Sequence, residues 1–290
     1  MKDFSYSAPT TLAEASKLLA GAGGKAKILA GGTDILVQLR EGMREADVVV
    51  DVKKIPELAE LSLSAAGLRL GACVPCYRIY DDAKIAAAYP ALADAARIIG
   101  GWQIQSRASI GGNLCNSSPA ADSIPALIAL GATAVIAGPS GQRQVKVEEF
   151  CTGPGKNVLQ PGELLVTLVF PAPGSKANSA YERFIPRNEM DIAVVGAGSW
   201  LKLSSDGKTI EQARISVGAV APTPKFAAEA STWLVGKPAN EATYAQAGEL
   251  AKKVASPITD MRGPAEYRTH LVGVLVKRTL AAAAQRAIGQ

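Results

Sequence analysis

The sequence predicts an α+β protein of 290 residues that is built from three parts. Three observations predict this class. Short apolar runs alternate with helix-like segments over the first half of the chain. The stretch from Pro171 to Ser175, rich in proline and glycine, interrupts that pattern as a linker. Beyond it, three strand patterns are followed by a helical region that ends the chain.

The first part, residues 1–56, is predicted to be a small β-α-β-α-β unit. Thr11 and Glu14 have the spacing of a capping box, so a helix is expected to begin there. Thr33 is a good N-cap for a second helix that runs to Arg40. Strands are expected at 27–29 and 48–52. Residues 30–32 then form a strand-to-helix turn that faces the positive end of the second helix.

The second part, residues 57–175, is predicted to combine a sheet with several helices. Its strands are expected at 68–72, 133–137, 144–147 and 164–170, with a hairpin turn at 138–141. Its helices are expected at 77–88 and 91–99 and from Pro125 onward. The third part, residues 176–290, is predicted to contain antiparallel strands at 181–184, 193–203 and 213–220. A long final helix is expected from about Pro264 to Ala287.

Composition excludes several functional classes. The net charge is +5, but the 31 lysines and arginines are scattered and form no concentrated patch, so we expect no nucleic-acid partner. A solvated basic surface is the simplest reading, and a basic rim that recruits an anionic cofactor or an acidic partner is the alternative. The sequence contains neither a signal peptide nor a segment able to cross a bilayer. We therefore expect a cytoplasmic protein whose four cysteines are reduced.

Two glycine-rich segments are the candidate ligand site. One runs from Lys27 to Asp34 and contains Gly31-Gly32; the other runs from Ser109 to Asp122 and contains Gly111-Gly112. Paired glycines allow the backbone to pass close to a ligand, and nearby Asn, Ser and N–H groups donate to anionic oxygens. The two segments predict one pyrophosphate-binding cleft. Taken by spacing alone, they are equally compatible with plain loops.

Other chemistry is weakly represented in the chain. There is no G-x-G-x-x-G and no phosphate-binding P-loop motif. His270 is the only histidine and lies in a predicted helix, which excludes a multi-histidine metal site. Cys73 and Cys76 have C-x-x-C spacing, but Cys115 and Cys151 are isolated, so we expect structural thiols and no metal. The chain is thus expected to hold a cofactor that performs the chemistry.

Four stretches in order resemble the FAD-binding medium subunit of molybdenum hydroxylases, the family of carbon monoxide dehydrogenase and xanthine dehydrogenase flavoprotein subunits. They are residues 30–34, residues 109–113 with 118–122, residues 191–193, and residues 263–268 with 274–278. The resemblance covers essentially the whole chain. It implies an FAD-binding fold of the vanillyl-alcohol-oxidase (PCMH) type. Residues 1–56 and 57–175 would be two α/β FAD-binding subdomains, and residues 176–290 would form a C-terminal domain with a three-stranded antiparallel sheet and helices.

The resemblance also implies a function and partners. This chain would carry FAD in a cytoplasmic heterotrimer, as one half of a dimer of heterotrimers. A large subunit would hold molybdopterin and oxidise the substrate, and a small subunit would carry two [2Fe–2S] clusters. Electrons from those clusters would pass through FAD to an external acceptor. A stand-alone FAD oxidase of the same fold and a scaffold without FAD are the alternatives.

The resemblance assigns FAD contacts residue by residue. Residues 27–34 and 109–113 would surround the pyrophosphate and ribityl chain, Asp122 would accept hydrogen bonds from FAD, and Leu165 would be an apolar contact. Arg183 would favour the reduced anionic flavin, and residues 187–191 would control access of the acceptor. Structural roles, such as a helix N-cap at Asp122, remain alternatives. The full set is Lys27, Ile28, Leu29, Ala30, Gly31, Gly32, Thr33, Asp34, Ser109, Ile110, Gly111, Gly112, Asn113, Ser118, Asp122, Leu165, Arg183, Asp191 and Ile192.

The chain departs from some family members in two places. Ile192 stands where some relatives place an aromatic residue over the flavin, which leaves the packing of the flavin face open. Some relatives also insert a cysteine-bearing loop for a [4Fe–4S] cluster. The corresponding interval here holds only Cys115 and Cys151, so we expect no such cluster.

Overall fold

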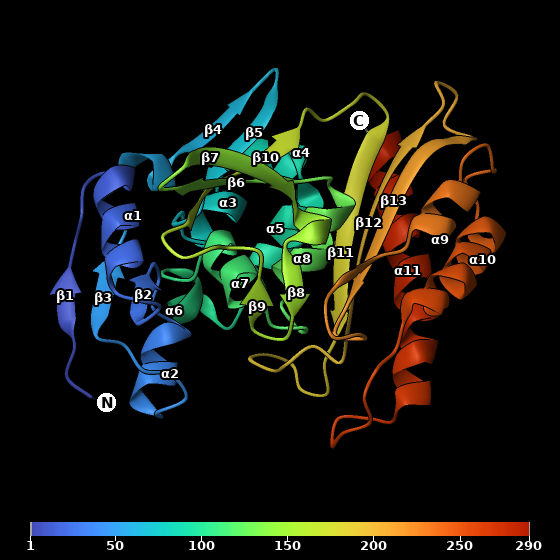
Figure 1. Cartoon of the computed structure of the whole chain (residues 1–290). Helices are drawn as coiled ribbons and strands as arrows, with labels where there is room; N and C mark the ends of the chain where they lie inside the picture. The colour runs from blue at the N-terminus through green and yellow to red at the C-terminus, as the bar shows by residue number, and fades with distance from the viewer. Residues whose placement is uncertain (1, 290) are drawn as a thin grey trace.

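A computed structural model describes residues 2–289, and its first sheet is small and parallel. Its strands lie in the order β1 (Ser5–Ser7), β3 (Val48–Asp51) and β2 (Ala26–Leu29). The helices α1 (Leu12–Gly21) and α2 (Ile35–Arg40) connect them (Figure 1). The predicted β-α-β-α-β unit is therefore present, with the first strand at Ser5–Ser7.

The second sheet has five antiparallel strands, because two hairpins are joined by the late strand β10 in the middle. Their order is β4 (Leu61–Ser64), β5 (Gly67–Gly71), β10 (Leu164–Pro171), β6 (Thr133–Gly138) and β7 (Gly141–Lys146). A separate two-stranded ribbon is formed by β8 (Cys151–Gly153) and β9 (Lys156–Asn157). The helices of this part are α3 (Tyr77–Tyr80), α4 (Ala83–Ala88), α5 (Pro90–Ala96), α6 (Trp102–Gln105), α7 (Ile110–Asn116) and α8 (Ser123–Ala129).

The third sheet contains the three predicted antiparallel strands and a short fourth one. Its order is β11 (Ala177–Phe184), β12 (Val195–Leu203), β13 (Ile210–Gly218) and β14 (Lys225–Phe226). The helices that follow are α9 (Ala228–Trp233), α10 (Glu241–Ala251) and the long α11 (Ala265–Ile288). Single 3₁₀ turns occur at Pro56–Ala59, Val147–Glu149 and Lys252–Val254. No helix within residues 2–289 combines the length and apolar character needed to span a membrane.

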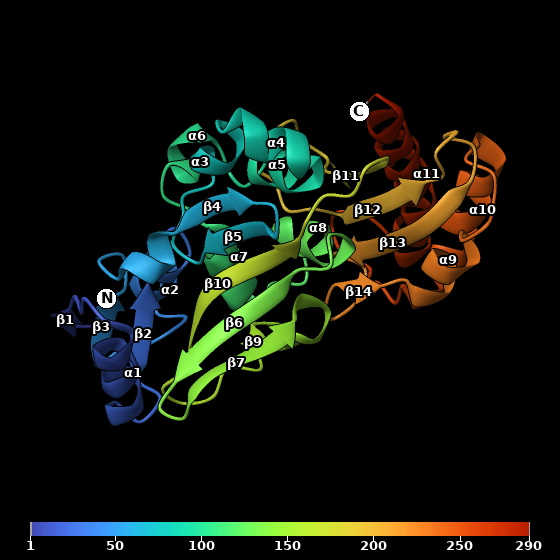
Figure 2. The same ribbon diagram turned by 90° about the horizontal axis from the view of Figure 1, so that it is seen from above.

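The three sheets lie side by side, with the five-stranded sheet in the middle (Figure 2). One core is shared by the first two parts, because Val50 in β3 and Val52 just after it belong to the same buried cluster as residues of the five-stranded sheet. A second core lies between the third sheet and α11. Side chains alternate between the two faces of a strand, so Tyr181 of β11 joins the first core while its neighbour Ala180 joins the second. Our division at residues 56 and 175 stays a proposal.

Several local predictions are confirmed and others are corrected. Thr11 caps α1 by accepting from the Glu14 N–H at 3.2 Å. Thr33 is not the cap of α2: the helix begins at Ile35, and Asp34 occupies the N-cap position without a side-chain cap bond. The expected helix over 77–88 is broken into α3 and α4, because Asp82 leaves helical geometry and caps α4. The helix expected from Pro125 begins at Ser123.

Candidate functional site

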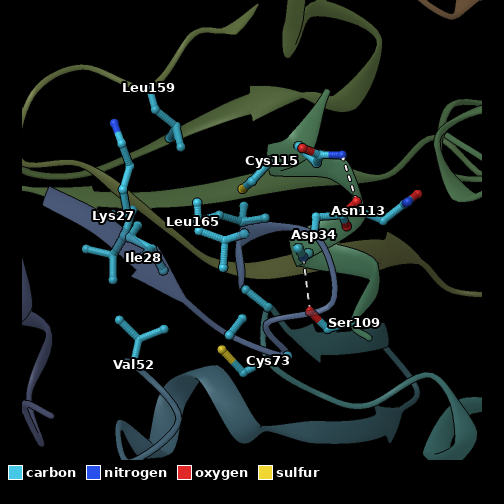
Figure 3. A pocket seen from close by; sticks show the side chains of 18 of the residues that line it. Lys27, Ile28, Asp34, Val52, Cys73, Ser109, Asn113, Cys115, Leu159 and Leu165 are labelled. Carbon is cyan, nitrogen blue, oxygen red and sulfur yellow. Dashed lines mark hydrogen bonds between the residues drawn. The ribbon is translucent and has the colours of Figure 1, made fainter. Parts of the chain in front are cut away.

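A cavity of about 490 Å³ lies between the first parallel sheet and the five-stranded sheet. Both glycine-rich segments line it, together with β2, α7, the start of β10 and the loop that precedes β10. Figure 3 shows side chains from these elements converging on one space. The volume falls within the range of small-molecule sites. The two segments, about 80 residues apart in the chain, are thus brought to one site.

The first glycine turn requires glycine for close packing as well as for access. A Cβ on Gly31 would lie 2.0 Å from the Arg107 carbonyl oxygen, so no other residue fits there. Gly32 has φ +84°, a left-handed conformation that side chains disfavour. The turn therefore packs directly against the backbone of Arg107 and Ala108, which precedes α7. This contact holds the two glycine segments next to one another.

The second glycine segment is not a plain loop at Gly111-Gly112, because these residues form the first turn of α7. Ser109 is its N-cap and accepts from the Gly112 N–H at 3.0 Å. Gly111 packs inward, where a Cβ would lie 2.5 Å from the Ala72 carbonyl oxygen. Gly112 lines the cavity, and an added Cβ there would meet only the Ser109 hydroxyl, at 3.0 Å. Both glycines line the cavity, but a side chain at Gly111 would clash with the Ala72 backbone, whereas one at Gly112 would meet only the Ser109 hydroxyl.

Polar side chains gather at one end of the cavity. The Asn116 amide donates to Asp34 at 3.3 Å, and the Gln38 amide donates to the Asn116 carbonyl at 3.1 Å. Asn113 accepts from both the backbone N–H and the hydroxyl of Ser123, which leaves its own amide N–H groups without a bond in the described chain. Burial raises the pKa of Asp34. Figure 3 shows Asp34, Asn113 and Ser109 at this end and Lys27 at the other.

The wall between these ends is largely apolar. Ile28, Val52 and Leu165 line it together with the side chains of Cys73 and Cys115 (Figure 3). Burial raises the pKa of both thiols to about 12, so they are neutral at physiological pH. Such a wall suits an aromatic or aliphatic ligand surface, whereas the polar end suits hydroxyl or anionic groups.

The predicted residues Asp122 and Arg183 form a separate group beside the third sheet. Arg183 donates to Asp122 at 2.5 Å and the Tyr181 hydroxyl donates to the same carboxylate at 3.2 Å. The side chains of this ion pair are only 7% and 12% exposed. Burial outweighs the attraction of Arg183 and raises the pKa of Asp122 to about 6. Asp122 is at the N-cap position of α8 but makes no cap bond, so the helix-cap alternative does not describe it.

The cavity gathers most of the predicted residues, but not all. The predicted residues that line it are Lys27, Ile28, Ala30, Gly31, Gly32, Thr33, Asp34, Ser109, Gly111, Gly112, Asn113 and Leu165. Ile110 is buried in the first core, and Leu29 packs on the small cluster around Leu39. Ser118 bonds within its own turn. Asp191 accepts from the exposed Arg187, and Ile192 is 52% exposed.

Sequence reasoning missed several lining residues. The segment from Leu159 to Leu164 forms one wall, and the turn dipeptide Pro161-Gly162 in front of a predicted strand could have marked it. Gln38, Arg44 and Asn116 also line the cavity, and no sequence pattern distinguishes them. Within residues 2–289, no three His, Cys, Asp or Glu side chains are grouped as metal ligands would be. His270 is an exposed residue of α11.

Comparison with known proteins agrees with this architecture. The family model "FAD binding domain in molybdopterin dehydrogenase" matches residues 2–173, and "CO dehydrogenase flavoprotein C-terminal domain" matches residues 179–283. The xanthine dehydrogenase FAD-binding subunit of Escherichia coli O157:H7 is 34% identical over 100% of this chain and 99% of its own length. The carbon monoxide dehydrogenase medium chain of Hydrogenophaga pseudoflava is 31% identical over 97% of this chain and 96% of its own.

Solved structures give the same result. A chain of the reconstituted CO dehydrogenase from Oligotropha carboxidovorans superposes with a TM-score of 0.93 at 31% identity, covering 98% of this chain and 99% of that one. A chain of quinoline 2-oxidoreductase from Pseudomonas putida 86 gives 0.90 at 32% identity, covering 99% and 100%. The predicted α+β FAD-binding fold is therefore confirmed. This chain belongs to the family of FAD-binding subunits of molybdopterin dehydrogenases and is an oxidoreductase subunit.

Proposed function

We propose that this cavity binds FAD and that the chain is the electron-transfer subunit of a heterotrimeric molybdenum hydroxylase. The observation that carries the proposal is the meeting of both glycine segments at one cavity, with an apolar wall and a polar end. FAD has the same division, because its ring systems are flat and apolar while its diphosphate and ribityl chain are polar. The open space in front of Gly112 gives the backbone close access to such a ligand.

Individual residues have separate roles in this proposal. Gly112 and the free amide N–H groups of Asn113 would approach the polar chain of the cofactor. Asp34 would accept hydrogen bonds from hydroxyl groups of the cofactor. An ionised carboxylate is an acceptor only, so it pairs with hydroxyl donors and not with phosphate oxygens. Ile28 and Leu165 would contact a ring. The neutral thiols of Cys73 and Cys115 would contribute apolar surface.

The group around Asp122 would border the flavin end of the site. It is connected to the cavity by Asn113, which accepts from Ser123, the residue next to Asp122. The backbone carbonyl of Asp191 also accepts from Arg183, at 3.4 Å. We therefore keep Ser118, Asp122, Arg183, Asp191 and Ile192 in the proposed site. A fixed guanidinium there would favour added negative charge.

When bound, FAD supplies electron exchange between two [2Fe–2S] clusters of a small partner subunit and an external acceptor. A large molybdopterin subunit would oxidise the substrate, and two heterotrimers would pair. This chain would bind FAD, orient it and exclude water from it. We also propose a cytoplasmic location, which agrees with the free state of Cys73, Cys76, Cys115 and Cys151.

The test is co-expression of this chain with its candidate large and small subunits, followed by purification of the complex. The proposal predicts about one FAD per copy of this chain, because both glycine segments line the same cavity. It also predicts that chemical reduction of the iron–sulfur subunit bleaches the flavin absorbance only when all subunits are present. A complex without flavin would contradict the proposal. Oxidation of a substrate by oxygen with this chain alone would instead support a stand-alone oxidase.

A further inference from the structure

Two cations lie close to one another at the cavity. Lys27 and Arg44 both line the cavity, and neither forms an ion pair with a carboxylate among residues 2–289. Among the residues that the structure describes, the only other charged ones in the lining are Asp34 and Glu163. Glu163 is neutralised by Arg143, which donates two hydrogen bonds of 2.7 Å to it. The free positive charge of the lining therefore comes from Lys27 and Arg44, and we call this pair the cationic rim.

Each cation of this rim reaches toward another part of the chain. The Lys27 ammonium donates to the Gly24 carbonyl at 3.2 Å. The Arg44 guanidinium extends from the loop after α2 to the turn of the β8–β9 ribbon, where its Nη2 would lie 3.7 Å from a Cβ on Gly155. Arg44 thus reaches from the first part of the chain to the second across the cavity edge.

The two charges repel one another. Burial lowers the pKa of Lys27, and the like charge of Arg44 lowers it further. Two cations at one cavity, without a carboxylate between them, are stabilised when an anion enters. The charge also creates a local field that raises the concentration of anionic ligands at the opening. The rim therefore suits a ligand with negative charge.

We propose that Lys27 and Arg44 form a cationic rim that attracts the diphosphate of the cofactor as it enters the cavity. Arg44 then increases the rate at which FAD associates with the chain. This inference rests on the proposed function, namely that the cavity takes FAD. It adds a residue that neither the glycine segments nor the resemblance pointed to. It also predicts a specific behaviour: uptake of FAD depends on salt, and uptake of an uncharged flavin does not.

The experiment uses the full-length chain after removal of flavin, with stopped-flow detection of flavin fluorescence. Arg44→Gln is compared with wild type and with Arg40→Gln. Arg40 is a matched control because it lies four residues away, is exposed, pairs with Glu41 at 2.9 Å and does not line the cavity. At about 20 mM salt, where charges act over roughly 20 Å, we expect FAD to associate with Arg44→Gln about three- to tenfold more slowly than with the other two.

Two further measurements separate charge from shape. At about 0.5 M salt, where the screening length is only a few ångströms, the three association rates should converge. Riboflavin has no phosphate, so it should associate at the same rate with all three proteins. Equal FAD rates for Arg44→Gln and Arg40→Gln would overturn the inference, as would an equal slowing of riboflavin. Absence of FAD uptake by the wild type would overturn the proposed function itself, and the inference with it.

Discussion

Replacing Gly112 by valine should expel the cofactor without unfolding the chain. Its Cβ would meet only the Ser109 hydroxyl at 3.0 Å, and the remaining space around it belongs to the cavity. The intrinsic helix propensity of valine exceeds that of glycine by a few tenths of a kcal/mol. Displacement of the Ser109 cap would cost about 1 kcal/mol. The folded state should therefore survive.

The effect on binding should be larger. The valine side chain would occupy space that a bound ligand needs, and such overpacking typically costs about 1–3 kcal/mol. This corresponds to roughly 5- to 150-fold weaker binding. Gly111→Val is the contrasting variant, because a Cβ there would lie 2.5 Å from the Ala72 backbone and should disturb the fold itself.

The assay combines the flavin-to-protein absorbance ratio after gel filtration with thermal unfolding. We expect Gly112→Val to unfold near the wild-type temperature but to retain little flavin. Gly111→Val should lose both stability and flavin. Wild-type flavin occupancy in a folded Gly112→Val protein would refute the placement of the cofactor at α7.

Three more predictions concern stability. Gly198→Ala would place a Cβ 2.7 Å from the Pro125 carbonyl oxygen and should lower the unfolding free energy by about 1–3 kcal/mol, whereas Gly153→Ala, whose nearest contacts are at 3.9 Å, should be nearly neutral in thermal melts. Ser109→Ala removes the cap of α7 and should cost about 0.5–2 kcal/mol in urea unfolding, with weaker flavin retention; an unchanged midpoint would contradict the capping role. Burial raises the pKa of Asp122 from 3.8 to about 6, so the folded state binds this proton more tightly than the unfolded state. The stabilisation from proton binding is fully present below the unfolded pKa and is lost as pH rises through the folded pKa. As the pH is lowered toward 4, the unfolding free energy of the wild type should rise by up to about 3 kcal/mol, and that of Asp122→Asn should not. An equal dependence of the unfolding free energy on pH in the two proteins would contradict this.

Much of the fold follows from local signals that the packing reinforces. The Thr11 cap and the hairpin around Gly138 and Gly141 were predictable because turn and cap chemistry act within a few residues. The long helix α11 was predictable from its length and its pattern. In each case the local preference and the tertiary contacts favour the same structure.

The site was harder to predict where tertiary contacts override local preference. Glycine disfavours helix, so local preference alone favours a loop at Gly111-Gly112. In the structure the Ser109 cap and the close contact with Ala72 make it helical. The ion pair between Asp122 and Arg183 joins residues 61 positions apart, and no spacing rule indicates it. Arg44 likewise reaches the cavity only because the first and second parts of the chain pack together.

The most direct test of the central claim is a crystal structure of the chain loaded with FAD. Our account predicts continuous ligand density along the cavity, in contact with residues 30–34 on one side and with Gly112 and Asn113 on the other. Flavin density at another place on the molecule would contradict the account. So would a cavity that stays closed by the chain's own side chains while flavin is bound elsewhere.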